Sequence, residues 1–193
     1  MDDKKYLPIK MLHLVLMFGA LVGCCYELYY GYSIAGFRLL TTIVDVLPIV
    51  AIIFGLYYFF NGYKKNAAVY YKLFMAFFIL DFGFSMFYGM INSLYDMYSA
   101  ILDLVCFTCI VLLYCGKDLG KTKSSALAII IVATRIIKLV ISLTVYSKAT
   151  IDMFSIMGLF TLMIKSITNV LLAGSAGLMV YGKYKDKEAR GAK

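Results

Sequence analysis

Residues 39–61 read LLTTIVDVLPIVAIIFGLYYFFN, an apolar run that contains a single charged side chain, Asp45. A helix needs about 20 apolar residues to cross the hydrocarbon core of a bilayer, because each residue adds about 1.5 Å of rise. Five other runs of similar character occur in the chain. The predicted spans are residues 11–31, 39–61, 72–94, 97–116, 124–147 and 153–182.

The composition agrees with a membrane protein. Apolar residues make up 63% of the chain and charged residues 16%, whereas a soluble domain usually carries about 25% charged residues. Turn residues separate the spans, and no long linker interrupts them. We therefore predict an all-α integral membrane protein in which residues 1–193 form one compact bundle of about six transmembrane helices, with the lipid bilayer as its main partner.

Positive charge predicts the orientation of the bundle. Fourteen of the 19 Lys and Arg residues lie before the first span, in the second and fourth loops or in the C-terminal tail, if Lys72 at the start of the third span is counted with the second loop. The other three loops hold only Arg38 and Lys148. Because loops rich in Lys and Arg stay in the cytoplasm, we expect a multi-pass protein of the bacterial plasma membrane with both termini cytoplasmic.

The net charge of +8 and the five cysteines have simple interpretations. The basic residues lie between apolar runs rather than in an aromatic-rich groove, so we expect no nucleic-acid partner. The cysteines lie within or beside apolar runs, and an odd number argues against a disulfide framework. Cys106 and Cys109 have the spacing of a redox pair, but burial in hydrocarbon disfavours the thiolate that such chemistry needs.

An alternative interpretation concerns the first span. Lys4, Lys5 and Lys10 precede an apolar run that ends at Cys24, a pattern that resembles a bacterial lipoprotein signal. The residues after Cys24 continue an amphipathic helix instead of a polar tether, which favours a retained span.

A faint repeat also includes the first span. With a shift of 58 residues, Tyr30 falls on Tyr88 and Asp45 falls on Asp103. The last two spans form a longer third copy with Asn169 at the corresponding place. The repeat predicts three helical hairpins around a central axis.

No sequence motif indicates catalysis. The chain has no Gly-rich phosphate loop, no paired-histidine helix and no nucleophile elbow. Its one histidine, His13, stands at the start of the first span, where we expect an interfacial position. We therefore expect no enzyme, no cofactor and no metal site, and a membrane-embedded enzyme is the least favoured alternative.

Charged residues inside the spans are the candidate site. A charge in hydrocarbon costs at least about 2.5–3.5 kcal/mol, so these side chains must face the interior, a water-filled cavity or the interface. The candidate ligand-binding residues are Glu27, Asp45, Asp81, Asp103, Arg135, Lys138, Lys165 and Asn169.

Two main interpretations of these charges remain open, and a third, chiefly for Glu27 and Lys138, is that the side chains snorkel to the interface. In one, they form buried ion pairs, with Asp81 close to Arg135. In the other, they form a solute site: an outward-facing vestibule lined by Glu27, Asp45 and Asp103 above a mixed-charge floor. Water or a bound cation would relieve the repulsion among the three acids.

Small residues offer close helix packing at Gly19 and Gly23 and at Gly174 and Gly177. Packing within the chain is the simpler interpretation, and a partner subunit at either face is the alternative. The sixth span would reach about 45 Å, so it must tilt strongly or begin at the interface.

In length and in its six-helix topology with both ends inside, the chain resembles the vitamin-binding subunits of energy-coupling-factor transporters. That resemblance implies an ATP-hydrolysing partner. We therefore predict a protein that binds or transports a small polar, cationic or zwitterionic solute. The alternative is a membrane accessory, sensor or assembly subunit whose charges are structural pairs.

Overall fold

The computed structural model describes residues 7–35, 39–62, 67–91, 97–116, 119–146 and 153–191. Within these ranges it contains six α-helices, and each includes a stretch long and apolar enough to cross a membrane. The prediction of six such helices is therefore confirmed. The helices are α1 (Leu7–Ala35), α2 (Leu39–Phe60), α3 (Ala68–Ile91), α4 (Met97–Cys115), α5 (Gly120–Tyr146) and α6 (Met153–Gly191).

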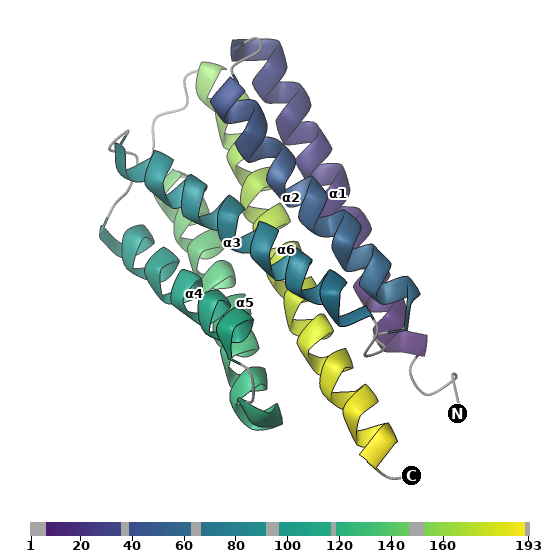
Figure 1. The fold of residues 1–193 in the computed structure, drawn as a ribbon. Coiled ribbons are helices and arrows are strands. Elements are labelled where there is room, and N and C mark those ends of the chain that lie inside the picture. The colour runs from purple at the N-terminus through teal and green to yellow at the C-terminus, as the bar shows by residue number, and fades with distance from the viewer. Residues whose placement is uncertain are drawn as a thin grey trace.

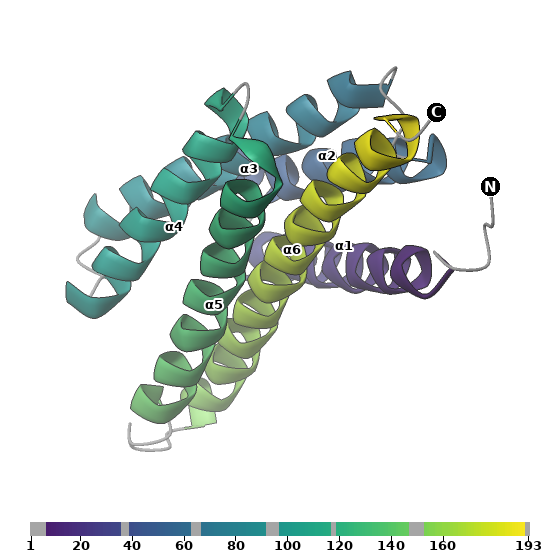
Figure 2. The ribbon, with the colours of Figure 1, turned by 90° about the horizontal axis from the view of Figure 1, so that it is seen from below.

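The helices pack in chain order around a ring. Each helix contacts the next, and α6 closes the ring by packing against α1. Figure 2 shows the bundle from below, with α6 between α1 and α5. The start of α1 and the end of α6 lie at the same end of the bundle (Figure 1). We call this the terminal end and the opposite one the far end. Helix α6 also contacts α2, so α1, α2 and α6 lie close together.

The helix boundaries follow the predicted spans closely, with one exception. Each helix begins within four residues of its predicted start, but α6 continues nine residues beyond the predicted end at 182. The tail after 182 is rich in Lys, Glu and Ala, which favour helix. The apolar stretch of α6 is Met163–Tyr184, about 33 Å long. One ordinary crossing accommodates this stretch without strong tilt.

Glycines mark two of the helix ends. Gly62 has a φ of 64°, in the left-handed region that glycine adopts without strain. Its N–H donates to the carbonyl of Phe59 at 2.8 Å, which closes the end of α2. Gly120 has a φ of 71° at the start of α5. Together they allow the chain to turn sharply at the terminal end of the bundle.

Small residues bring α1 and α6 into close contact. A Cβ atom placed on Gly23 would lie 2.0 Å from Oγ1 of Thr168, and one on Gly19 would lie 3.0 Å from Leu171. From the other side, Gly174 packs against Leu16. Both predicted glycine faces therefore pack within the chain, and a partner subunit would have to displace these contacts to use them.

The interior and the surface are both apolar. The largest fully buried side chains include Tyr58, Phe74, Phe78, Met17 and Leu172. Large apolar side chains are also exposed on all six helices, among them Val22, Ile53, Val69, Leu104, Ile129 and Ile167. Such a surface is unusual for a soluble monomer and suits a lipid environment.

Candidate functional site

The charged residues inside the bundle divide into two groups. One group, the α4–α5 cluster, consists of Asp103, Arg135 and Lys138. The other lines a small polar hollow between α1, α2, α3 and α6, which we call the carboxylate cavity. The first is closed by ion pairs, whereas the second contains three carboxylates and one lysine.

The α4–α5 cluster is centred on Asp103, which is 1% exposed. Its Oδ1 atom lies 3.1 Å from Nη1 of Arg135, and its Oδ2 atom accepts a hydrogen bond from Nζ of Lys138 at 2.5 Å. Arg135 also donates from Nε to the Cys106 sulfur at 3.4 Å, and its guanidinium lies 3.8 Å from the centroid of the Phe82 ring. These contacts compensate the burial of the charges, as a structural ion-pair network does.

The predicted ion pair between Arg135 and Asp81 is wrong. Asp81 and Arg135 are both buried, as expected, but the ion pair of Arg135 is with Asp103. The reason is the order of the helices, because α5 packs mainly against α4 and α6. Arg135 meets α3 through the ring of Phe82, the residue after Asp81.

The prediction that Asp103 lines a vestibule together with Glu27 and Asp45 is also wrong. Glu27 and Asp45 do line one hollow, but the third carboxylate there is Asp81. Asp103 is instead held by Arg135 and Lys138.

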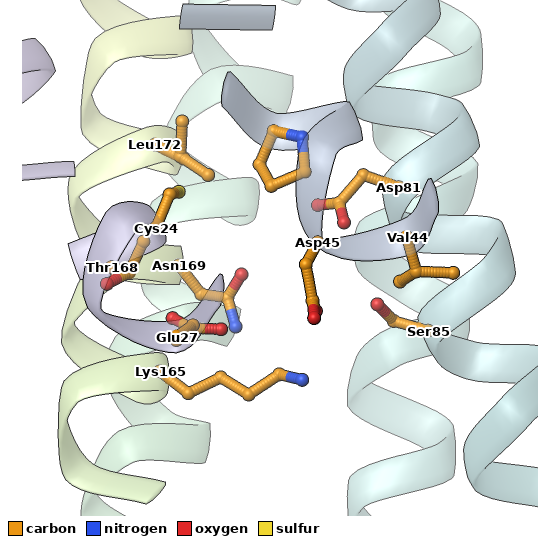
Figure 3. A pocket seen from close by; sticks show the side chains of 11 residues that line it. Cys24, Glu27, Val44, Asp45, Asp81, Ser85, Lys165, Thr168, Asn169 and Leu172 are labelled. Atoms are coloured by element: carbon orange, nitrogen blue, oxygen red, sulfur yellow. The ribbon is translucent and has the colours of Figure 1, made fainter. Parts of the chain in front are cut away.

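The carboxylate cavity gathers side chains from four helices, whose polar groups point toward a common space (Figure 3). Its volume is about 20 Å³, which suits water or a small ion rather than a larger molecule. Pro48, Cys24, Val44 and Leu172 complete its wall. The polar residues that line it are Glu27, Asp45, Asp81, Ser85, Lys165, Thr168 and Asn169.

Helical spacing explains why these residues meet. Lys165, Thr168, Asn169 and Leu172 are separated by three, one and three positions, so they share one face of α6. Asp81 and Ser85 are four apart on α3, and Asp45 and Pro48 are three apart on α2. Each helix therefore turns one polar stripe toward the cavity.

The cavity has an excess of negative charge. Among the described residues, it is lined by Glu27, Asp45 and Asp81 and by one cation, Lys165, whose charge acts on all three carboxylates. Lys165 extends across the cavity on its far-end side (Figure 3). Among the described residues that line the cavity, no ion pair is shorter than 4 Å, whereas Asp103 of the α4–α5 cluster forms two.

Asp81 is the most unusual residue of the cavity. It is 8% exposed, and the described part of the chain offers its carboxylate no hydrogen-bond or ion-pair partner. Its side chain points into the cavity (Figure 3). A buried carboxylate without a partner is costly to the fold. Asp81 therefore differs from Asp103, whose carboxylate forms ion pairs with two cations.

Sequence reasoning found part of this site. It included Glu27, Asp45, Asp81, Lys165 and Asn169, all of which line the cavity. It missed Thr168, although Thr168 follows Lys165 by three residues and so shares its face.

The structure shows the surroundings of His13. This residue is fully buried and packs edge-on against Phe59 in the last turn of α2, with ring centroids 5.5 Å apart. Its interfacial depth in a membrane stays a prediction.

The chemistry of the cavity favours binding. Carboxylate, hydroxyl and amide oxygens can accept hydrogen bonds from an ammonium group or replace part of the hydration shell of an ion. The described residues contain no group of three His, Cys, Asp or Glu side chains arranged to hold a metal ion.

Comparison with protein-family models, curated proteins and solved structures found no match to this chain. The resemblance to vitamin-binding transporter subunits thus remains one of length and topology. What the bundle binds must be inferred from its side chains, because a fold does not by itself specify a function.

Proposed function

We propose that this chain is a multi-pass membrane protein that binds, or carries across the membrane, a small polar solute with a cationic group. The binding site is the carboxylate cavity. The observation that carries the proposal is Asp81, a buried carboxylate to which the described residues offer no hydrogen-bond or ion-pair partner and which points into a polar hollow beside Glu27 and Asp45.

Insertion into a membrane is part of this proposal. It is supported by the six long apolar helices and by the apolar side chains exposed on each of them. The lysine distribution supports cytoplasmic termini, and hence a far end that faces outward. Lys64, Lys65, Lys117 and Lys148 lie outside the described residues, so this orientation rests on the sequence.

A cation would relieve the electrostatic cost of the cavity. Three nearby carboxylates repel one another, and Lys165 can compensate only one formal charge. An ammonium group or a monovalent ion bound among them would offset this repulsion and would form an ion pair with Asp81. A zwitterion could in addition place its own carboxylate near Lys165. Because the cavity is small, a larger solute would require the helices around it to separate.

The second candidate is a membrane accessory, sensor or assembly protein. It is supported by the α4–α5 cluster, in which every charge has a partner, as expected of a purely structural network. This candidate explains Asp103, Arg135 and Lys138 but leaves the carboxylate cavity without a role. We therefore prefer the solute-binding proposal.

The proposal can be tested by thermal unfolding in lipid nanodiscs, followed with a fluorogenic thiol dye that reacts with the buried Cys24 and Cys106 as they become exposed. Sodium, potassium, ammonium, methylammonium and glycine betaine are compared at constant ionic strength. A ligand at 100 times its Kd stabilises the folded state by about 2.7 kcal/mol. We expect at least one cation to raise the unfolding midpoint by several degrees.

The control uses the same substitution in each charged group. Asp45→Asn should abolish the cation-dependent shift, whereas Asp103→Asn should retain it from a lower starting midpoint. A panel without any shift, or a shift that survives Asp45→Asn, would refute a binding site in the carboxylate cavity.

A further inference from the structure

A second hollow adjoins the carboxylate cavity. It is a groove of about 460 Å³ between the last turns of α1 and the first turns of α2, a volume within the usual range of ligand sites. Asp45 belongs to both hollows. The residues that shape the groove include Leu28, Tyr29, Gly31, Tyr32, Thr42 and Asp45.

The groove opens on the outer face of the bundle. Tyr29 is 72% exposed and Tyr32 is 64% exposed. They continue the exposed apolar face that Phe18 and Val22 form nearer the middle of α1. In a membrane, this face would meet lipid, so the mouth of the groove lies toward the bilayer near the far end of the bundle.

Gly31 keeps the inner end of the groove clear. A Cβ atom at this position would lie 3.4 Å from Oδ2 of Asp45, in van der Waals contact with the carboxylate. Any longer side chain would occupy the space next to that oxygen. With glycine here, the Asp45 carboxylate remains within reach of a molecule that lies in the groove.

We propose that the groove and Asp45 together bind an amphiphilic organic monocation, which reaches the carboxylate cavity laterally between α1 and α2. Its ammonium group binds Asp45, and its apolar body lies against Leu28 and the tyrosines. This inference rests on the proposed function, since it names the class of solute and its route.

Charge and shape both favour this occupant. The one ionisable carboxylate that lines the groove in the described part of the chain is Asp45, so a single positive charge is matched there. The faces of Tyr29 and Tyr32 attract cations as well as apolar surface. The lateral route also avoids Lys165, whose positive charge stands on the far-end side of the cavity.

The test compares hexylammonium, methylammonium and 1-hexanol by titration calorimetry on the full chain in lipid nanodiscs, with empty nanodiscs as the blank. Hexylammonium has both the charge and the apolar body, and each of the other probes has only one. Gly31→Leu fills the groove beside Asp45. Gly83→Ala is the matched control, because its added Cβ would meet Phe107 at an ordinary 3.6 Å.

We expect hexylammonium to bind at least tenfold more tightly than methylammonium and 1-hexanol. Gly31→Leu should remove this difference in affinity. Asp45→Asn should weaken the binding of both ammonium ions at least tenfold. Gly83→Ala should leave the affinity for both ammonium ions unchanged. Equal binding of 1-hexanol and hexylammonium would overturn the inference, because the groove would then hold apolar chains, such as lipid tails, regardless of charge.

Two other results separate this inference from the proposed function. If both ammonium ions bind equally, and depend on Asp45 but not on Gly31, the lateral groove is wrong and the cation site stands. If neither ammonium ion binds and Asp45→Asn has no effect, both proposals fail.

Discussion

Replacement of Asp103 by Asn is expected to lower the free energy of unfolding by about 3–5 kcal/mol. The carboxylate is 1% exposed and pairs with both Arg135 and Lys138. An amide of the same shape leaves two neighbouring cations without a counter-charge, and one of them, Arg135, is itself buried. Unfolding in nanodiscs, followed with the fluorogenic thiol dye, measures the loss.

Lys138→Gln provides the comparison for this variant. The side chain of Lys138 is 25% exposed, and its removal leaves Asp103 paired with Arg135. Its cost should therefore be clearly smaller than that of Asp103→Asn. Equal stability of Asp103→Asn and the parent would show that the cluster is not a structural pair.

The same substitution at Asp81 should change the free energy of unfolding in the opposite direction. Asp81→Asn is expected to raise the free energy of unfolding by about 1–3 kcal/mol, because it removes a buried carboxylate that has no hydrogen-bond or ion-pair partner among the described residues. Binding sites are often less stable than the same positions optimised for stability alone. The assay is the same thermal unfolding, performed without added ligand.

The two aspartates thus distinguish a structural network from a site. If Asp81→Asn destabilises the protein as much as Asp103→Asn, then Asp81 has a structural partner and the cavity is part of the packing. If it stabilises the protein while abolishing the cation-dependent shift, the cost of Asp81 is linked to binding.

Apolar length predicted the helices well. Asp45 stands in an otherwise uncharged run, and the helix that contains it begins and ends within one residue of the prediction. The hydrogen bonds of a helix continue beyond the apolar run into the polar tail, so hydropathy alone missed the extension of α6 to Gly191. The three-hairpin repeat remains a prediction.

Pairing between charges was harder to predict. The sequence shows that Arg135 needs an acid, but Asp81 and Asp103 satisfy that need equally until the neighbours of α5 are known. The depth of a residue in the bundle could be estimated from its distance to the end of its helix. This estimate correctly placed Glu27 and Asp45 at a similar distance from the far end of the bundle. Helix rotation could not be estimated that way, and it is rotation that turns Asp103 toward α5 and away from the cavity.

The uncharged members of the site give weak sequence signals. Thr168 and Ser85 are common in membrane helices and carry no charge that must be explained, so only their spacing from Lys165 and Asp81 links them to the cavity. Gly31 is recognisable as part of the groove only once the position of the Asp45 carboxylate is known.

The accessibility of positions 45 and 103 tests the central claim most directly. Single cysteines are placed there in a chain without its five native cysteines, and intact cells are treated with a membrane-impermeant thiol reagent. A cysteine in place of exposed Ser33 serves as the positive control. We predict that Asp45→Cys reacts from outside and that Asp103→Cys does not. An inert position 45 beside a reactive position 33 would contradict an externally accessible carboxylate cavity, and labelling at 103 would contradict the closed α4–α5 cluster.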